Sequence, residues 1–230
     1  MRISIVRIFL AAAVLGGIAA ANSQTAVRRE TIEWCNLRWE NTNDLKLPRV
    51  LLIGDSISVG YGSVVKERLK GKANVDALAT SKAISDPGWL KETTYAIEGY
   101  RHAVIHFNNG LHGGHVTGQD YESSLRDYVK KLRELAPHAK LIWANTTPVP
   151  SSQKGVALDE KGNATALARN AIAGKVMKEA GIPINDLYGL VVGDIEKLTA
   201  SKGNVHYNGK GKTLQGEAVA DAILKALDQR

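Results

Sequence analysis

Short apolar runs alternate with amphipathic patterns along nearly the whole chain, and this alternation is the strongest constraint on its fold. Runs of branched aliphatic residues predict strands, and apolar residues spaced three and four apart predict helices. Strands are predicted at residues 49–53, 74–79, 103–107, 140–144 and 182–185. Helices are predicted at residues 59–69, 89–99, 119–136, 164–180 and 211–227. Such alternation favours an α/β fold in which helices cover both faces of a central parallel sheet.

The first 23 residues differ in character from the rest of the chain. Two arginines precede an apolar stretch at residues 8–20, and Ala19-Ala20-Ala21 fits an A-x-A cleavage site. We therefore predict a secretory signal peptide at residues 1–23 and a single domain at residues 24–230. An uncleaved anchor is the alternative, although the stretch is short for a span of about 20 apolar residues. The expected location is secreted or periplasmic, with no stable membrane insertion after cleavage.

Charge and cysteine content narrow the function class. The chain carries 30 Lys and Arg against 23 Asp and Glu, a net charge of +7, and loss of Arg2 and Arg7 with the signal peptide leaves +5. The remaining basic residues are mixed with acids, as in Lys66-Glu67-Arg68, so no nucleic-acid partner is predicted. Cys35 is the only cysteine, which excludes an intrachain disulfide.

The apolar run at residues 49–53 stops abruptly at Gly54-Asp55-Ser56, and a candidate helix follows. A turn at the carboxyl end of a buried parallel strand places its side chains at the edge of the sheet where α/β folds bind ligands. Ser56 is therefore a candidate nucleophile. The alternative is that Ser56 only caps the helix, because Ser and Asp are ordinary capping residues.

A serine nucleophile needs a base, which must come from another loop at the same edge. Of the six histidines, His206 is the candidate because it lies in a loop, residues 202–211, that leads directly into the last predicted helix. His102, His106 and His138 lie in or beside predicted strands and turns, where structural or solvent-exposed roles are expected.

Gly54-Asp55-Ser56-Ile57-Ser58 and Val205-His206-Tyr207-Asn208 resemble the first and last motifs of the SGNH (GDSL) hydrolase superfamily. The resemblance spans about residues 49–227, nearly the whole predicted domain. It implies a flavodoxin-like three-layer α/β/α sandwich with a central parallel sheet. It also implies a serine hydrolase mechanism that needs no metal, and a small-molecule or glycan ester as the substrate.

The third motif of that family carries an Asn side chain that donates to the oxyanion, and its position here is ambiguous. Alignment on the strand end selects Asn108 or Asn109, whereas alignment on the following glycine selects His112. The segment Phe-Asn-Asn-Gly-Leu-His resembles a secreted subgroup with Asn-x-Gly-Leu-His in this motif. Asn108, Asn109 and His112 are thus the candidate oxyanion or substrate-binding residues, since each side chain can donate. The glycine of the second motif has no clear counterpart in residues 79–83.

The family's usual Asp three residues before the histidine is Gly203 here. A main-chain carbonyl can fix the tautomer of a histidine without adding a charge. We therefore expect a Ser56–His206 dyad, with Nδ1 of His206 held by the carbonyl of Gly203 or of a neighbour within residues 201–204. Two carboxylates are the alternative acceptors, Asp194 and Glu196.

A metal site is a further possibility, raised by His112 and His115, which lie three residues apart on a glycine-rich loop. No carboxylate or cysteine stands at ligand spacing beside them, so neither a metal nor another cofactor is expected.

Together these patterns predict a secreted serine esterase. The resemblance further implies that it hydrolyses short-chain acyl esters, for example acetyl esters of carbohydrates, through an acyl-enzyme. Two alternatives remain at this stage. One is a non-catalytic carbohydrate-binding or scaffold protein of the same fold, favoured by the Gly in place of Asp at position 203. The other is an acyltransferase that uses the same Ser and His.

Overall fold

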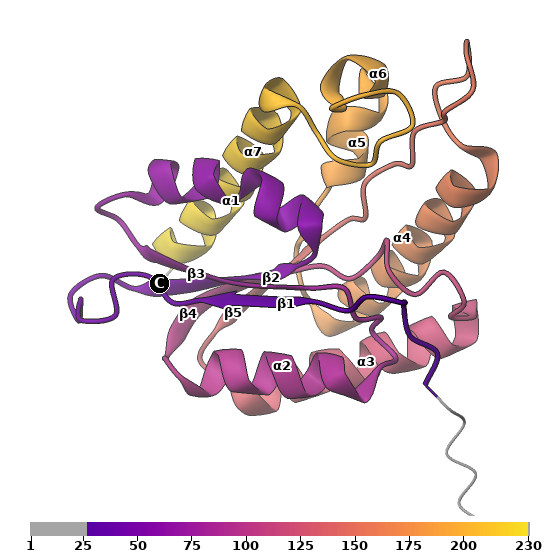
Figure 1. Cartoon of the computed structure of the whole chain (residues 1–230). Helices are drawn as coiled ribbons and strands as arrows, with labels where there is room; N and C mark the ends of the chain where they lie inside the picture. The colour runs from indigo at the N-terminus through magenta and orange to yellow at the C-terminus, as the bar shows by residue number, and fades with distance from the viewer. Residues whose placement is uncertain (1–26, 230) are drawn as a thin grey trace, which may run out of the picture.

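The structure is a computed structural model that describes residues 27–229, so the expected signal peptide at residues 1–23 lies outside the described residues. Within them, a six-stranded sheet with the order β1-β3-β2-β4-β5-β6 forms the centre of the molecule (Figure 1). Its strands are β1 (Cys35–Arg38), β2 (Arg49–Gly54), β3 (Asn74–Thr80), β4 (His102–Phe107), β5 (Lys140–Ala144) and β6 (Ile184–Asn185). β1 pairs antiparallel to β3, and all other pairs are parallel.

Helices cover both faces of the sheet, and each face has its own apolar core (Figure 1). One face carries α1 (Ser56–Leu69), α5 (Leu187–Val192), α6 (Ile195–Leu198) and α7 (Gly209–Asp228). The other carries α2 (Pro87–Glu98), α3 (Gly118–Leu135) and α4 (Glu160–Ala180). The predicted three-layer α/β/α sandwich is therefore confirmed.

The differences from the predicted elements lie in short or half-exposed segments. β1 was not predicted because its four residues, Cys-Asn-Leu-Arg, are exposed or only half-buried and show no apolar run. The strand predicted at residues 182–185 is only two residues long, and α5 and α6 follow it. Helices of four to six residues are too short to show a periodic pattern.

The strand order explains where a site can form. After β2 the chain crosses to β3 on one side, and β4 then pairs with the other side of β2. The loops that follow β2 and β4 thus diverge over opposite faces, which opens a crevice at the carboxyl edge of the sheet. Ser56 follows the last residue of β2 by two positions, and Asn108 comes directly after β4.

Two of the histidines assigned structural roles are buried. Nε2 of His102 lies 2.9 Å from Oδ2 of Asp76, within hydrogen-bond distance. The other carboxylate oxygen of Asp76, Oδ1, lies 2.6 Å from Nη2 of Arg49. This cluster joins the amino ends of β2, β3 and β4, at the edge opposite Ser56. His106 lies inside β4 with 1% of its surface exposed.

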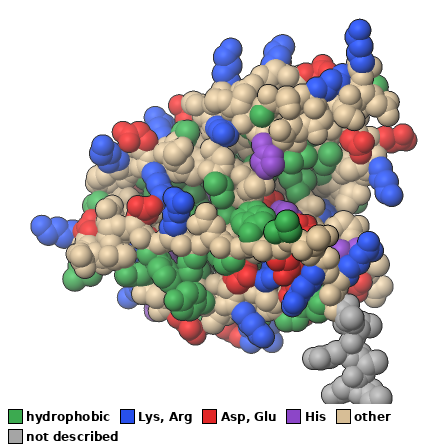
Figure 2. Space-filling model, viewed as in Figure 1, with side chains coloured by type: hydrophobic (Ala, Val, Ile, Leu, Met, Phe, Trp, Pro, Cys, Tyr) green, Lys and Arg blue, Asp and Glu red, His purple; other side chains and the backbone are tan. Residues whose placement is uncertain are grey.

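The surface shows no concentration of one charge on the face seen in Figure 2, where Lys and Arg side chains project at separate points among Asp and Glu. None of the helices in residues 27–229 has the length and apolar character that crossing a bilayer requires.

Candidate active site

Ser56 is held at the amino end of α1 by the turn that follows β2. Asp55 is the N-cap, because its Oδ1 accepts a hydrogen bond of 2.8 Å from the backbone N–H of Ile57. Oγ of Ser58 donates to the Asp55 carbonyl at 2.7 Å. The capping role considered for Ser56 therefore belongs to Asp55, and the Ser56 hydroxyl is free for another partner.

That partner is His206. Nε2 of His206 lies 2.9 Å from Oγ of Ser56, although the two residues are 150 positions apart in the chain. This distance is within the range for a hydrogen bond between a nucleophile and its base. The fold thus brings together the two residues predicted to react.

The other ring nitrogen of His206 faces Asn204. The Oδ1 atom of Asn204 lies 2.9 Å from the backbone N of His206 and 2.9 Å from its Nδ1. A backbone N–H can only donate, so the Asn204 atom that it meets must be the carbonyl oxygen. The same oxygen requires a proton on Nδ1, which leaves Nε2 as a lone-pair acceptor toward Ser56.

The prediction of a backbone carbonyl as the acceptor for Nδ1 is therefore wrong, because the side-chain amide of Asn204 accepts this hydrogen bond. Asn204 forms a turn in which its side chain bonds the N–H two residues on, a geometry that Asn favours. Gly203 has a φ of +72° and packs closely against Ser152, so it serves the turn. Within residues 27–229 no carboxylate bonds to His206, and Asp194 pairs instead with Lys197.

The loop that carries His206 is anchored on both sides. The His206 carbonyl accepts a hydrogen bond of 2.8 Å from the N–H of Ala200. Asn208 caps α7 through Gly211 and donates from Nδ2 to the carbonyls of Lys197 and Thr199. These bonds fix the imidazole over the carboxyl edge of the sheet.

Ser56 and His206 open into a cleft of about 610 Å³. Its walls come from the segment before β1, the loop after β4, the start of α4 and the loop before α7. Side chains that line it besides the reacting pair include Glu30, His112, Asp159, Lys161 and Arg169. A volume of this size is within the range for small-molecule sites.

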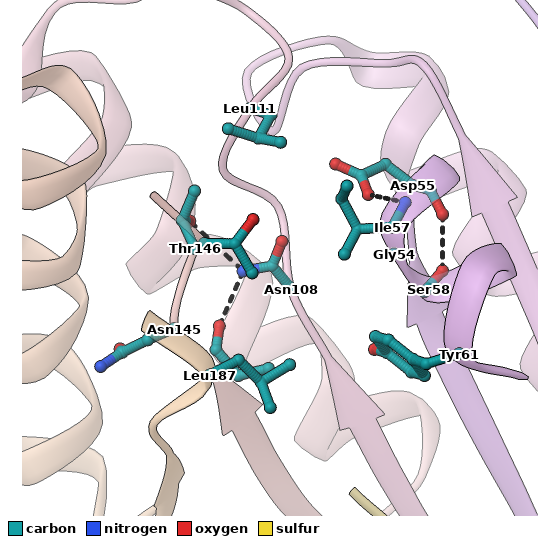
Figure 3. Close-up of a pocket in the computed structure, with 12 residues that line it drawn as sticks. Gly54, Asp55, Ile57, Ser58, Tyr61, Asn108, Leu111, Asn145, Thr146 and Leu187 are labelled. Carbon is teal, nitrogen blue, oxygen red and sulfur yellow. Dashed lines mark hydrogen bonds between the residues drawn. The ribbon is translucent and has the colours of Figure 1, made fainter. Parts of the chain in front are cut away.

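A second, smaller cavity lies between the β2–α1 turn and the ends of β4 and β5 (Figure 3). It holds about 20 Å³, and it shares Asp55 and Leu111 with the cleft. Asn108 lines this cavity, and its Nδ2 donates to the Ala144 carbonyl at 2.7 Å and to Oγ1 of Thr146 at 3.4 Å. Both donors of the Asn108 amide are thus committed away from Ser56.

Asn109 is buried and joins two loops. Its Nδ2 donates to the Lys82 carbonyl at 2.8 Å, and its Oδ1 accepts from the N–H of Ile84 at 3.1 Å. Asn109 does not line the cleft with Ser56. Of the three residues suggested by the third motif, the structure brings only His112 into that cleft.

A buried arginine shapes the loop that carries His112. Arg169 of α4 donates to three backbone carbonyls, those of Gly110 at 2.5 Å, His112 at 2.9 Å and Gly113 at 2.5 Å. Its guanidinium also lies 5.2 Å from the ring centre of Tyr121. Burial lowers the pKa of Arg169, so this loop is held at the cost of burying a cation beside the cleft.

The electrostatics of the site depend on one buried acid. Burial raises the pKa of the Asp55 carboxyl, while the bond from the Ile57 N–H and the nearby His112 and His206 oppose that rise.

No group of three or more His, Cys, Asp or Glu with the geometry of a metal site occurs among residues 27–229.

No protein-family model and no curated protein sequence matches the chain. Solved structures do. A GDSL-like lipase from Bacteroides thetaiotaomicron is 17% identical, with a TM-score of 0.59 over 77% of this chain and 88% of that chain. A carbohydrate acetylesterase from Sinorhizobium meliloti is 13% identical, with a TM-score of 0.63 over 77% of this chain and 99% of that chain. The chain has the SGNH hydrolase fold. A carbohydrate esterase of family 3 from Talaromyces cellulolyticus shares this SGNH fold at 16% identity and a TM-score of 0.63. The match covers 80% of this chain and 100% of that chain.

Three residues of this candidate site were not identified from the sequence. Asn204 had a usable signal, because an Asn two residues before a histidine can place its amide oxygen at the ring. Arg169 lies inside a helical pattern and resembles a solvent-exposed arginine in the sequence. Glu30 lies 82 positions from His112, its partner in the fold, and no local pattern connects them.

Proposed function

We propose that this protein is an exported serine esterase that hydrolyses short-chain acyl esters. Ser56 is the nucleophile, His206 is the base, and Asn204 orients the base. The observation that carries the proposal is the 2.9 Å contact between Ser56 Oγ and His206 Nε2, with Nδ1 occupied by Asn204. The solved structures of the same fold include a GDSL-like lipase and a carbohydrate acetylesterase, which supports esters as the substrate class.

The reaction proceeds in two steps. Oγ of Ser56 attacks the acyl carbon as its proton moves to Nε2 of His206, and the tetrahedral intermediate then collapses. The alcohol leaves with the proton from Nε2, and the acyl group stays on Ser56. Water then attacks the acyl-enzyme as its proton moves to Nε2 of His206. The second tetrahedral intermediate collapses, His206 returns that proton to Oγ of Ser56, and the carboxylic acid is released.

The oxyanion of each tetrahedral intermediate needs donors. Ser56 is the first residue of α1, so its backbone N–H has no acceptor within the helix. The helix dipole adds partial positive charge at the same place. Gly110 lines the cleft, and its N–H has no acceptor among residues 27–229. We assign these two backbone groups as the oxyanion donors, in place of the Asn108 side chain.

The shape of the site favours a small acyl group on a larger alcohol. The cavity beside Asp55 holds about 20 Å³, roughly the space of one water molecule, and neither Ser56 nor His206 lines it, so it offers no pocket for a long acyl chain. The cleft of about 610 Å³ offers both acidic and basic side chains, which suits an alcohol with several hydroxyl groups. An acetylated glycan fits both features.

Activity on p-nitrophenyl acetate tests the proposal. The purified domain should hydrolyse it, and Ser56→Ala and His206→Ala should each lower kcat by at least about 10³-fold. Ser63→Ala, on the exposed side of α1, and His138→Ala are matched controls that should keep the wild-type rate. If both site variants kept their activity, the assignment of Ser56 and His206 would be contradicted. A wild-type protein that is inactive on p-nitrophenyl acetate and on acetylated glycans would favour the non-catalytic alternative.

Two further measurements address export and acyl transfer. Mass spectrometry of the protein recovered from outside the cytoplasm should give an N-terminus near residues 21–23. Release of acetate in the absence of any sugar acceptor distinguishes a hydrolase from an acyltransferase.

A further inference from the structure

A second histidine lines the cleft beside the reacting pair, and it is also held by a polar partner. Nδ1 of His112 lies 2.7 Å from Oε1 of Glu30. Glu30 belongs to the segment before β1, and both residues line the same cleft as Ser56 and His206. The side chain of His112 is 19% exposed, so a ligand in the cleft has access to it.

The pair fixes which atom of His112 can meet a ligand. An ionised carboxylate only accepts hydrogen bonds, so Nδ1 of His112 carries a proton when it faces Glu30. A neutral imidazole then has its lone pair on Nε2. Nε2 has no hydrogen-bond partner among residues 27–229. The neutral form of His112 therefore presents an acceptor to the cleft, whereas an oxyanion needs a donor.

The segment that carries Glu30 is tied down at several points. Nε of Arg29 binds Oδ2 of Asp86 at 3.1 Å, and the carboxylate of Glu33 binds Nζ of Lys82 at 2.6 Å. The ring of Trp34 meets the His112 ring edge-on, with centroids 6.2 Å apart. Glu30 is thus part of a fixed wall, and His112 is held between a carboxylate and an indole.

On the basis of the proposed esterase function, we infer that His112, oriented by Glu30, accepts a hydrogen bond from a hydroxyl of the substrate's alcohol part. The substrate class is then an ester of a polyhydroxyl alcohol that keeps a free hydroxyl near the ester, such as a partly acetylated sugar. His112 acts as a specificity-determining residue, and Glu30 acts as a positioning residue through it.

Matched substrates test this inference. One is a monoacetylated methyl glycoside with its other hydroxyls free, the second is the same ester with those hydroxyls methylated, and the third is p-nitrophenyl acetate. His112→Leu should lower kcat/KM for the free-hydroxyl ester by about tenfold, mainly through KM, because one hydrogen bond is lost. The losses of kcat/KM on the methylated ester and on p-nitrophenyl acetate should be at least about threefold smaller, so that the preference for the free-hydroxyl ester falls in this variant.

Variants of Glu30 extend the test. Glu30→Leu should also lower the preference in kcat/KM for the free-hydroxyl ester over the methylated ester. The double variant Glu30→Leu, His112→Leu should have the same preference as His112→Leu alone, because Glu30 acts through His112. His115→Leu is the matched control, because His115 is exposed on the same loop and does not line the cleft. An equal loss on all three substrates, or no loss on any, would overturn the role assigned to His112.

A binding measurement separates this inference from the esterase proposal. Calorimetry with Ser56→Ala and the free-hydroxyl ester reads affinity without turnover. The double variant Ser56→Ala, His112→Leu should bind about tenfold more weakly, whereas equal affinity would refute the inference. Activity of the wild-type protein and its loss in Ser56→Ala remain the separate test of the esterase function.

Discussion

The Oδ1 atom of Asn204 lies 2.9 Å from both the backbone N and the Nδ1 of His206. The first contact fixes which end of the amide faces the ring, and the second fixes the ring's tautomer. A neutral amide can therefore do what the missing carboxylate at position 203 would do in orienting the base. This removes the main reason to favour a non-catalytic protein, since Gly in place of Asp does not leave His206 unoriented.

Asn204→Ala should lower kcat by about 10- to 100-fold, because Nδ1 loses its acceptor and the wrong tautomer of His206 becomes populated. Asn204→Asp keeps the oxygen that both groups need, so it should retain at least the wild-type kcat. Steady-state kinetics on p-nitrophenyl acetate checks both, with Ser201→Ala on the same exposed loop as the control. A wild-type kcat in Asn204→Ala would show that the contact is not needed.

Gly110→Ala should disrupt the site, because a Cβ at this position would lie 1.6 Å from Oγ1 of Thr146. Thr146 cannot move aside easily, since Asn170 binds its backbone N–H and its carbonyl, each at 2.8 Å. We expect a loss of about 1–3 kcal/mol in the free energy of unfolding, together with lower kcat. Urea denaturation measures the loss. Gly114→Ala on the same loop meets open space and should leave stability unchanged within about 0.5 kcal/mol.

Arg169→Lys should weaken the loop after β4 despite keeping the charge. A lysine has one nitrogen and cannot reach the three carbonyls of Gly110, His112 and Gly113 with the same geometry. We expect kcat/KM to fall by about tenfold and the free energy of unfolding to fall by about 2 kcal/mol. Arg126→Lys, at a surface pair with Glu122, is the control and should change neither quantity appreciably. Retention of the wild-type values by Arg169→Lys would argue against this account of the loop.

His106 should make stability depend on pH. Burial lowers the pKa of His106 to about 4, below the value of about 6.5 expected in the unfolded chain. The unfolded chain binds more protons between these two values, so stability falls as the pH drops from 6.5 toward 4. Between pH 7 and pH 5 the wild-type protein should lose about 2 kcal/mol more than His106→Gln. Urea unfolding at both pH values measures this difference, and equal losses in the two proteins would rule it out.

The sequence reveals the fold well because buried parallel strands leave continuous apolar runs, as in residues 49–53. Ser56 and His206 are recognisable for a related reason, since each lies at the boundary between such a run or loop and a helix. Contacts between side chains that are distant in the sequence could not be predicted in this way. The pairing of Glu30 with His112, and of Arg169 with the loop after β4, depends on which segments meet at the cleft. Asn108 and Asn109 were ambiguous because two neighbouring amides can exchange roles through a small shift in register, and packing decides between them.

The segment before β1 contributes a wall of the cleft, while β2, α1 and the loop before α7 hold the reacting pair. Under the proposed function, one part of the substrate-facing wall thus lies in a segment that is separate in sequence from the reacting pair. Under the proposed function, variation of Glu30 alone, the residue of this segment that lines the cleft, would alter which alcohols are accepted, with the attacking serine and its base left untouched. If the proposed esterase function holds, this segment is therefore where the accepted alcohol can be changed while Ser56 and His206 stay in place.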